Sequence, residues 1–175
     1  MPNTLVITIM GPDRPGIVAE MAACVAEHGG NWLESRLVHL GGQFAGVLRV
    51  EVPTENAEAL QSALKSFEKA GLTSIAKAER ATLEPFVTHR LVKVDLVGSD
   101  RPGILRAVSA ALSRHSVNIE ELSTERRAAP MSGEPLFQAR AAIRLPAEST
   151  LPDLRTELEK IAGDLLVDLT VSLPD

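Results

Sequence analysis

Aromatic side chains are scarce in this chain of 175 residues, which contains four Phe, one Trp and no Tyr. So few rings offer no platform on which single-stranded nucleic acid could stack its bases. Positive charge is not in excess either, because the formal net charge is −5 at pH 7. Residues 1–88 carry 7 Lys and Arg against 10 Asp and Glu, and residues 89–175 carry 11 against 13. Neither half is basic, so direct binding to nucleic acid is not expected.

Cysteine is nearly absent, which indicates the kind of cellular compartment in which the protein is found. Cys24 is the only one, so no intrachain disulfide can form, which is typical of a reducing environment. The opening residues MPNTLVITIMGPDRPG lack the basic leader and apolar stretch of a signal peptide. No run approaches the roughly 18 apolar residues of a membrane span. We expect a cytoplasmic protein that does not associate with membranes.

Catalytic and metal-binding patterns are missing too. The chain has no G-x-S-x-G nucleophile elbow and no GK[ST] phosphate loop. Cys24 lies among Ala and Val in a helical pattern, which favours a buried, inert thiol over a nucleophile. No pair of histidines has metal-ligand spacing among His28, His39, His89 and His115. We expect neither an enzyme nor a bound metal or cofactor.

What the chain does contain is a repeat. GPDRPGIVAE, residues 11–20, returns 87 positions later as GSDRPGILRA, residues 98–107. At this offset, residues 11–34 align with residues 98–121 without a gap, and ten of the 24 aligned pairs are identical. The matched pairs are Gly11/Gly98, Asp13/Asp100, Arg14/Arg101, Pro15/Pro102, Gly16/Gly103, Ile17/Ile104, Ala23/Ala110, His28/His115, Asn31/Asn118 and Glu34/Glu121. We infer an internal duplication, with domains at residues 1–86 and 87–175.

Each half predicts the element order β-α-β-β-α-β, because runs rich in β-branched residues alternate with segments of helical period. The expected strands are Thr4–Met10, Asn31–Leu40, Phe44–Val52 and Thr73–Leu83, then Leu91–Val97, Asn118–Arg127, Leu136–Leu145 and Leu165–Leu173. This order is the ferredoxin-like plan of the α+β class, an antiparallel four-stranded sheet with both helices on one face. Pairing or packing between the units would cover the remaining face and edge, and residues 83–86 are the expected linker.

The helices have recognisable stripes and ends. The stripe of the first helix in each half comprises Ile17, Val18, Met21 and Val25, and Ile104, Leu105, Val108 and Leu112. The second helix of the first half should end at Gly71, and Gly41-Gly42 predicts a tight hairpin. In the last helix, Ser149 or Thr150 is the expected N-cap, Pro152 lies in the first turn and Gly163 follows the end.

The repeated loop combines residues typical of a strand-to-helix turn. Gly11 and Gly98 permit a sharp exit or a close approach. Asp13 and Asp100 are candidate N-caps, and Pro15 and Pro102 suit a first turn. Gly16 and Gly103 then fall inside a helix, where glycine costs roughly 1 kcal/mol relative to Ala. A ligand that approaches the first turn closely would explain that cost.

Two interpretations of these residues remain open. A helix N-terminus favours an anion such as a carboxylate, but a capped turn would also be repeated if the domain was simply duplicated. Asn31 and Asn118 begin a strand expected at the sheet edge, where they either face a partner unit or serve as turn residues. His28 and His115 suit the end of a helix, where imidazolium favours the dipole.

These residues resemble a tandem of ACT domains, small amino-acid-sensing modules with the same element order and a G-x-[DN]-R-P-G loop. The resemblance covers both halves. In the first half, LVITIMGPDRPGIV and GGNWLESRLVHLGGQFAG are similar to the family of glycine cleavage system transcriptional repressors, whose members consist of two ACT domains.

The resemblance implies a site for an amino acid between this loop and a neighbouring ACT unit, with an Asn from the start of the second strand. The matching positions, with the rest of each loop, are Gly11, Asp13, Arg14, Pro15, Gly16 and Asn31, and Gly98, Asp100, Arg101, Pro102, Gly103 and Asn118. Some amino-acid-binding members carry a side-chain donor where this chain has Gly11 and Gly98. That contact is therefore made by the backbone here, or is absent.

The resemblance also implies a function. It is that of a non-enzymatic, amino-acid-responsive regulator of glycine cleavage, with glycine or a near relative as ligand. Its partner would be a DNA-binding transcription activator protein rather than DNA itself. A homodimer is left open, because a second chain often completes the site of an ACT module. The alternative is a protein-interaction module whose ligand loops are vestigial.

Overall fold

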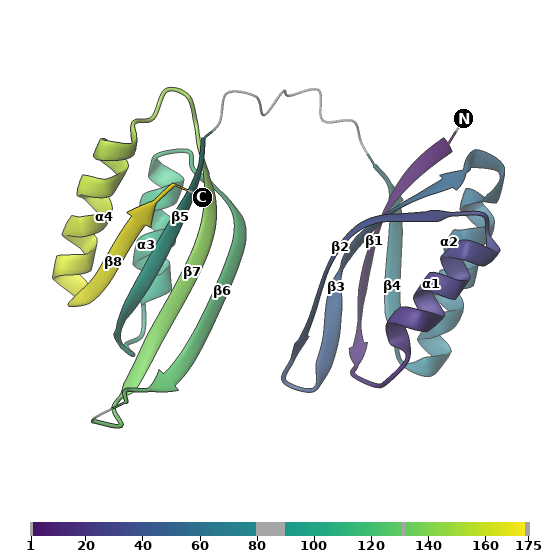
Figure 1. Ribbon diagram of the computed structural model, residues 1–175, viewed down its shortest axis with the longest axis horizontal. Coiled ribbons are helices and arrows are strands. Elements are labelled where there is room, and N and C mark those ends of the chain that lie inside the picture. The colour runs from purple at the N-terminus through teal and green to yellow at the C-terminus, as the bar shows by residue number, and fades with distance from the viewer. Residues whose placement is uncertain (1, 80–89, 131, 174–175) are drawn as a thin grey trace. The chain divides into compact units, whose positions relative to one another are not determined.

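The computed structural model describes residues 2–79, 90–130 and 132–173. The chain divides into two compact units, Met1–Leu83 and Glu84–Asp175 (Figure 1). The expected boundary between residues 86 and 87 and the expected linker at residues 83–86 lie outside the described residues.

Both units have the predicted element order. Unit 1 contains β1 (Pro2–Pro12), α1 (Ile17–Glu27), β2 (Asn31–Leu40), β3 (Gln43–Pro53), the 3-10 turn η1 (Thr54–Asn56), α2 (Ala57–Lys65), the 3-10 turn η2 (Ser66–Ala70) and β4 (Thr73–Ala78). Unit 2 contains β5 (Arg90–Ser99), α3 (Ile104–Arg114), β6 (Asn118–Ala128), β7 (Pro135–Leu145), α4 (Leu151–Leu165) and β8 (Val167–Ser172).

Each unit is a four-stranded antiparallel sheet, in the order β2-β3-β1-β4 or β6-β7-β5-β8. In each unit the two helices lie on the same face of the sheet (Figure 1). The ferredoxin-like prediction is therefore confirmed, and so is the expectation that the strand beginning with Asn31 or Asn118 runs at an edge.

The cores follow from alternation along the central strands. In β1, Leu5, Ile7 and Ile9 are buried beneath the helices, while the residues between them face the other way. The buried core of unit 1 also includes Ile17, Met21, Cys24, Val25, Leu48, Val50, Val52, Ala57, Leu60, Leu64 and Leu72. That of unit 2 comprises Val92, Val94, Leu96, Ile104, Val108, Ala111, Leu112, Val117, Ala139, Ile143, Leu145, Leu154, Leu158, Ala162, Val167 and Val171.

The duplication extends to irregular features of the backbone. β2 shifts register between Trp32 and Glu34, and β6 shifts between Ile119 and Glu121, the matching positions. The N-caps of α1 and α3 are Gly16 and Gly103, with φ of 94° and 96°. Such detailed agreement supports the inference that one ancestral unit was copied.

The expected cap of the first helix in each unit is wrong. Asp13 and Asp100 do not cap α1 and α3, because the N-cap positions belong to Gly16 and Gly103, without a side-chain hydrogen bond. The two glycines therefore lie at the start of the helix rather than inside it, and Pro15 and Pro102 precede the helix. Their left-handed backbone conformation explains the glycines without a ligand.

Three further expectations about the helices need correction. Val18 and Leu105 are not buried with the predicted stripes, since they are 47% and 38% exposed. Cys24 and Ala111 are buried instead, because they lie on the same face as Met21 and Val108. Gly163 does not follow α4 but lies inside it, and the helix ends where Leu166 adopts a left-handed conformation, so β8 begins only at Val167.

Other helix ends agree with the prediction. Thr150 caps α4 by accepting a hydrogen bond from the Asp153 amide, and Pro152 lies in the first turn. The helical segment after η1 continues through η2 and stops at Gly71, whose φ is 81°. Strand β4 ends at Ala78, and residues 80–83 of the expected strand lie outside the described residues.

Glycine substitutions test these backbone assignments. Gly16→Ala should lower the free energy of unfolding by about 1–2 kcal/mol, because Ala is strained in the left-handed region. Gly163→Ala should instead raise it by up to about 1 kcal/mol, because Ala is the better residue in a helix interior. Urea unfolding of both variants measures the difference. Equal effects of the two substitutions would contradict the assignment of Gly16 to a left-handed cap.

An ion cluster joins the two helices of unit 2. Glu157 of α4 accepts hydrogen bonds from Arg114, whose Nε lies 3.1 Å from Oε1, and also contacts His115 at the end of α3. The hydrogen bond from Arg114 and then that from His115 hold the pKa of Glu157 below its usual value. Glu157 therefore stabilises the fold in its charged form, and it loses this contribution as pH falls through its lowered pKa.

We expect Glu157→Gln to lower the free energy of unfolding at pH 7 by about 1 kcal/mol, because the cluster lies at the surface. The deficit should shrink as pH falls below about 4.3, the ordinary pKa of glutamate, since the parent then loses its charge as well. Chemical unfolding at a series of pH values measures it. A deficit that stays constant down to pH 3 would show that Glu157 acts by packing alone.

Candidate functional site

The repeated loop connects the central strand of each sheet to the first helix. In unit 1 the Asp13 amide donates a hydrogen bond to the Gly42 carbonyl at 2.9 Å, which ties the loop to the β2–β3 hairpin. In unit 2 the Asp100 amide donates to the Pro135 carbonyl, also at 2.9 Å. Both loops are thus positioned by the same contact at the same end of their sheets.

The glycines that open the loops serve the packing of their own unit. A Cβ on Gly11 would collide with the carbonyl oxygen of Gly71 and would lie 3.0 Å from the Leu72 Cα. A Cβ on Gly98 would overlap the side chain of Val167 and would lie 2.9 Å from the Val167 Cα. The close approach expected at these positions is therefore made by the last strand and the turn before it.

The loop of unit 1 is closed by an ion pair. Two nitrogens of Arg14 each donate to an oxygen of Glu20 at 2.6 Å. These hydrogen bonds raise the pKa of Arg14 and lower the pKa of Glu20. A Cβ on Gly16 would lie 3.7 Å from the Glu20 carboxylate, so this carboxylate lies beside the start of α1. An incoming carboxylate would meet both an occupied guanidinium and a negative charge.

The loop of unit 2 lacks that closure. Ala107 stands where unit 1 has Glu20, and nothing lies within 4 Å of a Cβ on Gly103. Arg101 is exposed, and it has no ion pair within the ranges that the structure describes. The start of α3 and one guanidinium are therefore accessible to an anion.

The aspartates of the two loops also differ in their partners. Asp13 lies 3.8 Å from His39 of β2, whereas Asp100 lies 2.8 Å from Arg126 at the matching position of β6. The loop of unit 1 holds one permanent cation, Arg14, against the two anions Asp13 and Glu20. The loop of unit 2 holds two cations, Arg101 and Arg126, against one anion, Asp100. The copies therefore present opposite charge to a ligand, and unit 2 suits a carboxylate better.

The predicted asparagines lie at the other end of the unit. Asn31 pairs with Glu51, which pairs with Thr4 near the start of β1, whereas Gly11 is seven residues further along that strand. At about 3.3 Å per residue the separation is about 23 Å. Asn118 is likewise opposite Arg144 and Leu91, far from Gly98. The structure does not bring the loop and the asparagine of one unit together.

Each asparagine has its own surroundings at that far end. Asn31 lines an open hollow with Gly29, Glu51 and Pro53. Asn118 donates a hydrogen bond to Glu120 at 2.6 Å, and Glu120 pairs with Arg144 at 3.2 Å. The hydrogen bond from Arg144, then that from Asn118, lowers the pKa of Glu120. Both asparagines are exposed, and the Asn118 amide is held by a carboxylate of its own unit.

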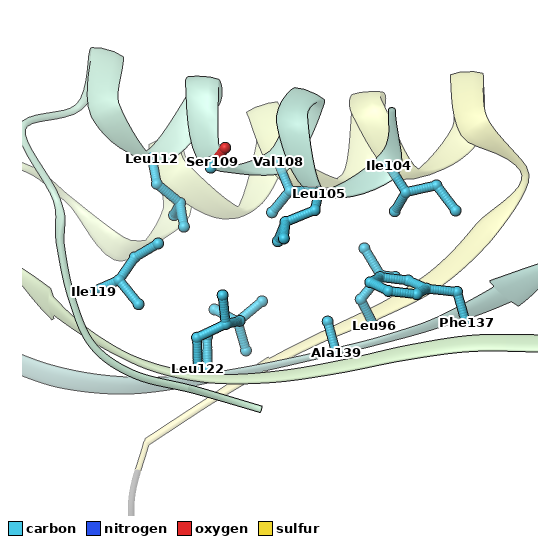
Figure 2. A pocket seen from close by; sticks show the side chains of 12 residues that line it. Leu96, Ile104, Leu105, Val108, Ser109, Leu112, Ile119, Leu122, Phe137 and Ala139 are labelled. Carbon is cyan, nitrogen blue, oxygen red and sulfur yellow. The ribbon is translucent and has the colours of Figure 1, made fainter. Parts of the chain in front are cut away.

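Unit 2 also holds an apolar cavity between α3 and its sheet. In Figure 2, Leu105, Val108 and Leu112 of α3 point toward Ala139 and Leu122 of the strands below. The cavity measures about 20 Å³, which is close to the room one water needs. It is too small for an amino acid, and its lining offers almost no polar group to hold one. In unit 1, Leu48 and Met21 fill the positions of Ala141 and Val108.

Three further predictions concern a reactive cysteine, a metal site and a membrane-spanning helix, none of which the sequence leads us to expect. Cys24 is buried as predicted, and its burial and then the nearby Glu27 raise the pKa of the thiol, so it is a poor nucleophile. Within the described ranges, no group of three or more His, Cys, Asp or Glu side chains could hold a metal ion. None of the helices in that part of the chain combines the length and apolar character needed to cross a bilayer.

Sequence reasoning missed the residues that distinguish the loops. Glu20, His39 and Arg126 contact the predicted loop residues Arg14, Asp13 and Asp100. The same offset of 87 that revealed the repeat pairs Glu20 with Ala107 and His39 with Arg126. The signal is therefore present in the sequence as mismatches between the two copies, whereas a site shared by both copies would be marked by identities.

The two arginines should differ in reactivity. Arg101 should react several-fold faster than Arg14 with phenylglyoxal, because Glu20 holds Arg14 whereas no carboxylate among the described residues holds Arg101. Glu20→Gln should remove most of the difference, and Ala107→Glu should protect Arg101. Peptide mass spectrometry after a short exposure measures both sites in one sample. Equal rates in the parent protein would contradict the closed state of the first loop.

Comparison with known proteins agrees with this geometry. The sequence model of the ACT domain family matches residues 3–74. The glycine cleavage system transcriptional repressor of Escherichia coli strain K12 is 26% identical over 164 residues, which cover 92% of this chain and 85% of that protein. A UPF0237 protein of Methanopyrus kandleri is 36% identical over 84 residues, covering 47% of this chain and 86% of that protein.

A solved structure shows the same architecture over the full length. The crystal structure of an unknown protein from Galdieria sulphuraria superposes with a TM-score of 0.85 and 27% sequence identity, covering 100% of both chains. The duplicated ferredoxin-like units, their G-x-D-R-P-G loops and these similarities lead to one assignment. The chain belongs to the ACT domain family, as a tandem ACT-domain protein similar to the glycine cleavage system transcriptional repressor.

Proposed function

We propose that this protein is a non-enzymatic, amino-acid-responsive regulator of transcription, and that the loop at residues 98–103 binds the carboxylate of the amino acid. The observation that supports this most directly is the accessible start of α3 beside Arg101, which is exposed and has no ion pair with any residue that the structure describes. Backbone N–H groups at a helix start and a guanidinium together favour a carboxylate. A regulatory function is supported by the name of the curated relative, a glycine cleavage system transcriptional repressor.

The ammonium group needs an acceptor, and Asp100 is the nearest candidate. Asp100 is paired with Arg126, but Arg126 is 67% exposed. Exposed ion pairs contribute little free energy, so a ligand can replace this one. The predicted asparagines, Asn31 and Asn118, lie most of a strand away from the loop of their own unit.

The ligand and partner follow from the named relative. Glycine, or a near relative, is the proposed amino acid, since the Escherichia coli protein is named for repression of the glycine cleavage system. A DNA-binding transcription activator is the proposed partner, because neither half of the chain carries the basic charge that DNA binding requires. The proposed location is the cytoplasm. Ligand binding can shift the equilibrium between two conformations of the protein only to the extent that the ligand binds one of them more tightly than the other.

A second candidate function rests on the closed loop of unit 1. There Glu20 occupies Arg14 and adds negative charge beside α1. If the loop of unit 2 were equally unable to bind, the protein would be an interaction module with vestigial ligand loops. The two candidates differ in one property, which is affinity for a free amino acid.

A thermal-shift screen against the free amino acids, followed by calorimetric titration, tests the proposal. A ligand at 100 times its dissociation constant adds about 2.7 kcal/mol of stability, which is readily seen. Glycine or a near relative should stabilise the protein selectively. Arg101→Ala should weaken binding by about 1–3 kcal/mol, because the carboxylate of the ligand loses its charged partner.

Lys93→Ala is the control, because Lys93 is an exposed cation on β5 that lies five residues before Gly98 and outside the start of α3. It should leave affinity unchanged. Stabilisation that survives Arg101→Ala would move the site away from the second loop. No stabilisation by any amino acid, with the protein folded, would favour the interaction module instead.

A further inference from the structure

The starts of α1 and α3 share one feature that sets them apart from the start of α4. Thr150 caps α4 with its side chain, whereas the glycines at the N-caps of α1 and α3 have no side chain with which to do so. Both helix starts therefore present backbone N–H groups that favour an anion. In unit 1 a carboxylate of the chain itself already lies there, that of Glu20.

Glu20 lies one turn into α1, and its side chain reaches back to the loop. Its amide donates to the Gly16 carbonyl at 2.9 Å, and its carboxylate oxygen Oε1 would lie 3.7 Å from a Cβ on Gly16. The Nη1 and Nη2 atoms of Arg14 each donate to a separate oxygen of this carboxylate at 2.6 Å. An arginine holds the carboxylate of a free amino acid in the same bidentate way. Glu20 thus occupies the cation that a ligand of this loop would use.

The contact between Arg14 and Glu20 is made at the surface, so it is reversible. The two side chains are 35% and 44% exposed, and exposed ion pairs contribute little free energy. The hydrogen bonds from Arg14 hold the pKa of Glu20 below its usual value, so Glu20 remains charged at neutral pH. A carboxylate at sufficient concentration can therefore replace Glu20 on Arg14, and only the Glu20 side chain has to move.

Unit 2 shows that the fold does not require a carboxylate at this position. Ala107 stands where unit 1 has Glu20, yet α3 begins at the same left-handed glycine, with φ of 96° against 94° in α1. Among the described residues, nothing lies within 4 Å of a Cβ on Gly103. The pair of Arg14 and Glu20 is thus not needed to form the loop, and its removal should change ligand binding rather than folding.

We propose that Glu20 is an internal competitor, which makes the loop of unit 1 a second, weaker site for the amino acid that the loop of unit 2 binds. This inference rests on the proposed function and adds to it a difference between the two sites. Because the ligand binds only those molecules in which Glu20 has released Arg14, its affinity for unit 1 should be roughly tenfold lower. The chain then responds to the amino acid in two concentration ranges, first through unit 2 and then through unit 1.

Titration of the isotope-labelled chain with glycine at pH 7, followed by the NMR signals of backbone amides, observes the two sites separately. The reporters are the amides of residues 17–19 at the start of α1 and 104–106 at the start of α3. In the parent chain, the first set should titrate at a roughly tenfold higher glycine concentration than the second. Glu20→Gln should lower the dissociation constant at residues 17–19 about tenfold and leave that at residues 104–106 unchanged.

Glu27→Gln is the matched control, because Glu27 is exposed at the other end of α1. It removes the same charge from the same helix and should change neither dissociation constant. Glu20→Ala introduces the residue type that unit 2 carries at this position, and it provides a second test if Glu20→Gln fails to fold. Ala107→Glu is the reverse change and should weaken glycine binding at residues 104–106.

The inference is overturned if residues 17–19 titrate alike in the parent chain and in a folded Glu20 variant, or if they titrate in neither. It is supported if those residues titrate only in the variant, or at a lower glycine concentration there. Residues 104–106 of the parent chain test the proposed function on their own. The failure of that function is therefore distinguishable from the failure of the role assigned to Glu20.

Discussion

The first strand of each unit, β1 or β5, is hydrogen-bonded on both edges, and its register is the constraint on which the rest of this structure depends. Alternate side chains of β1 bury Leu5, Ile7 and Ile9 beneath the helices, and a shift of one residue would turn all three to the opposite face. The register is therefore set by the core. Once it is set, the loop at residues 11–16 lies at one end of the sheet and Asn31 at the other.

This constraint explains how two copies of one fold can differ so much in their surfaces. The core positions of both units remain aliphatic, because a polar side chain there would lose hydration without gaining a partner. Exposed positions carry no such penalty. The two copies can therefore carry different side chains at matching exposed positions, Glu20 and Ala107 at one and Val47 and Arg140 at another, without a change in the backbone. The copies consequently share their N-cap glycines and strand irregularities but differ in loop charge and in the polarity of the sheet face opposite the helices.

The fold could be predicted in detail because its signals are local. Strand alternation, the hairpin at Gly41-Gly42 and the cap at Thr150 depend on residues close together in the chain. Errors arose where a local preference competed with packing. Asp13 is a good N-cap residue, but the left-handed turn at Gly16 starts the helix three residues later. Gly163 resembles a helix end, but Leu165 continues the helix and packs against the core.

The sequence by itself determined the duplication, the element order, the aliphatic core and the two loops, because each depends on spacing along the chain. Only the tertiary structure decided the state of those loops. Whether a guanidinium is occupied depends on which carboxylate lies within hydrogen-bonding distance, and Glu20, His39 and Arg126 reach the loops through the helix and the edge strand. The exposed apolar side chains on the face of the unit 1 sheet opposite the helices, among them Met10, Val38, Val47 and Ile75, likewise come from four strands, so no single stretch of sequence displays them together.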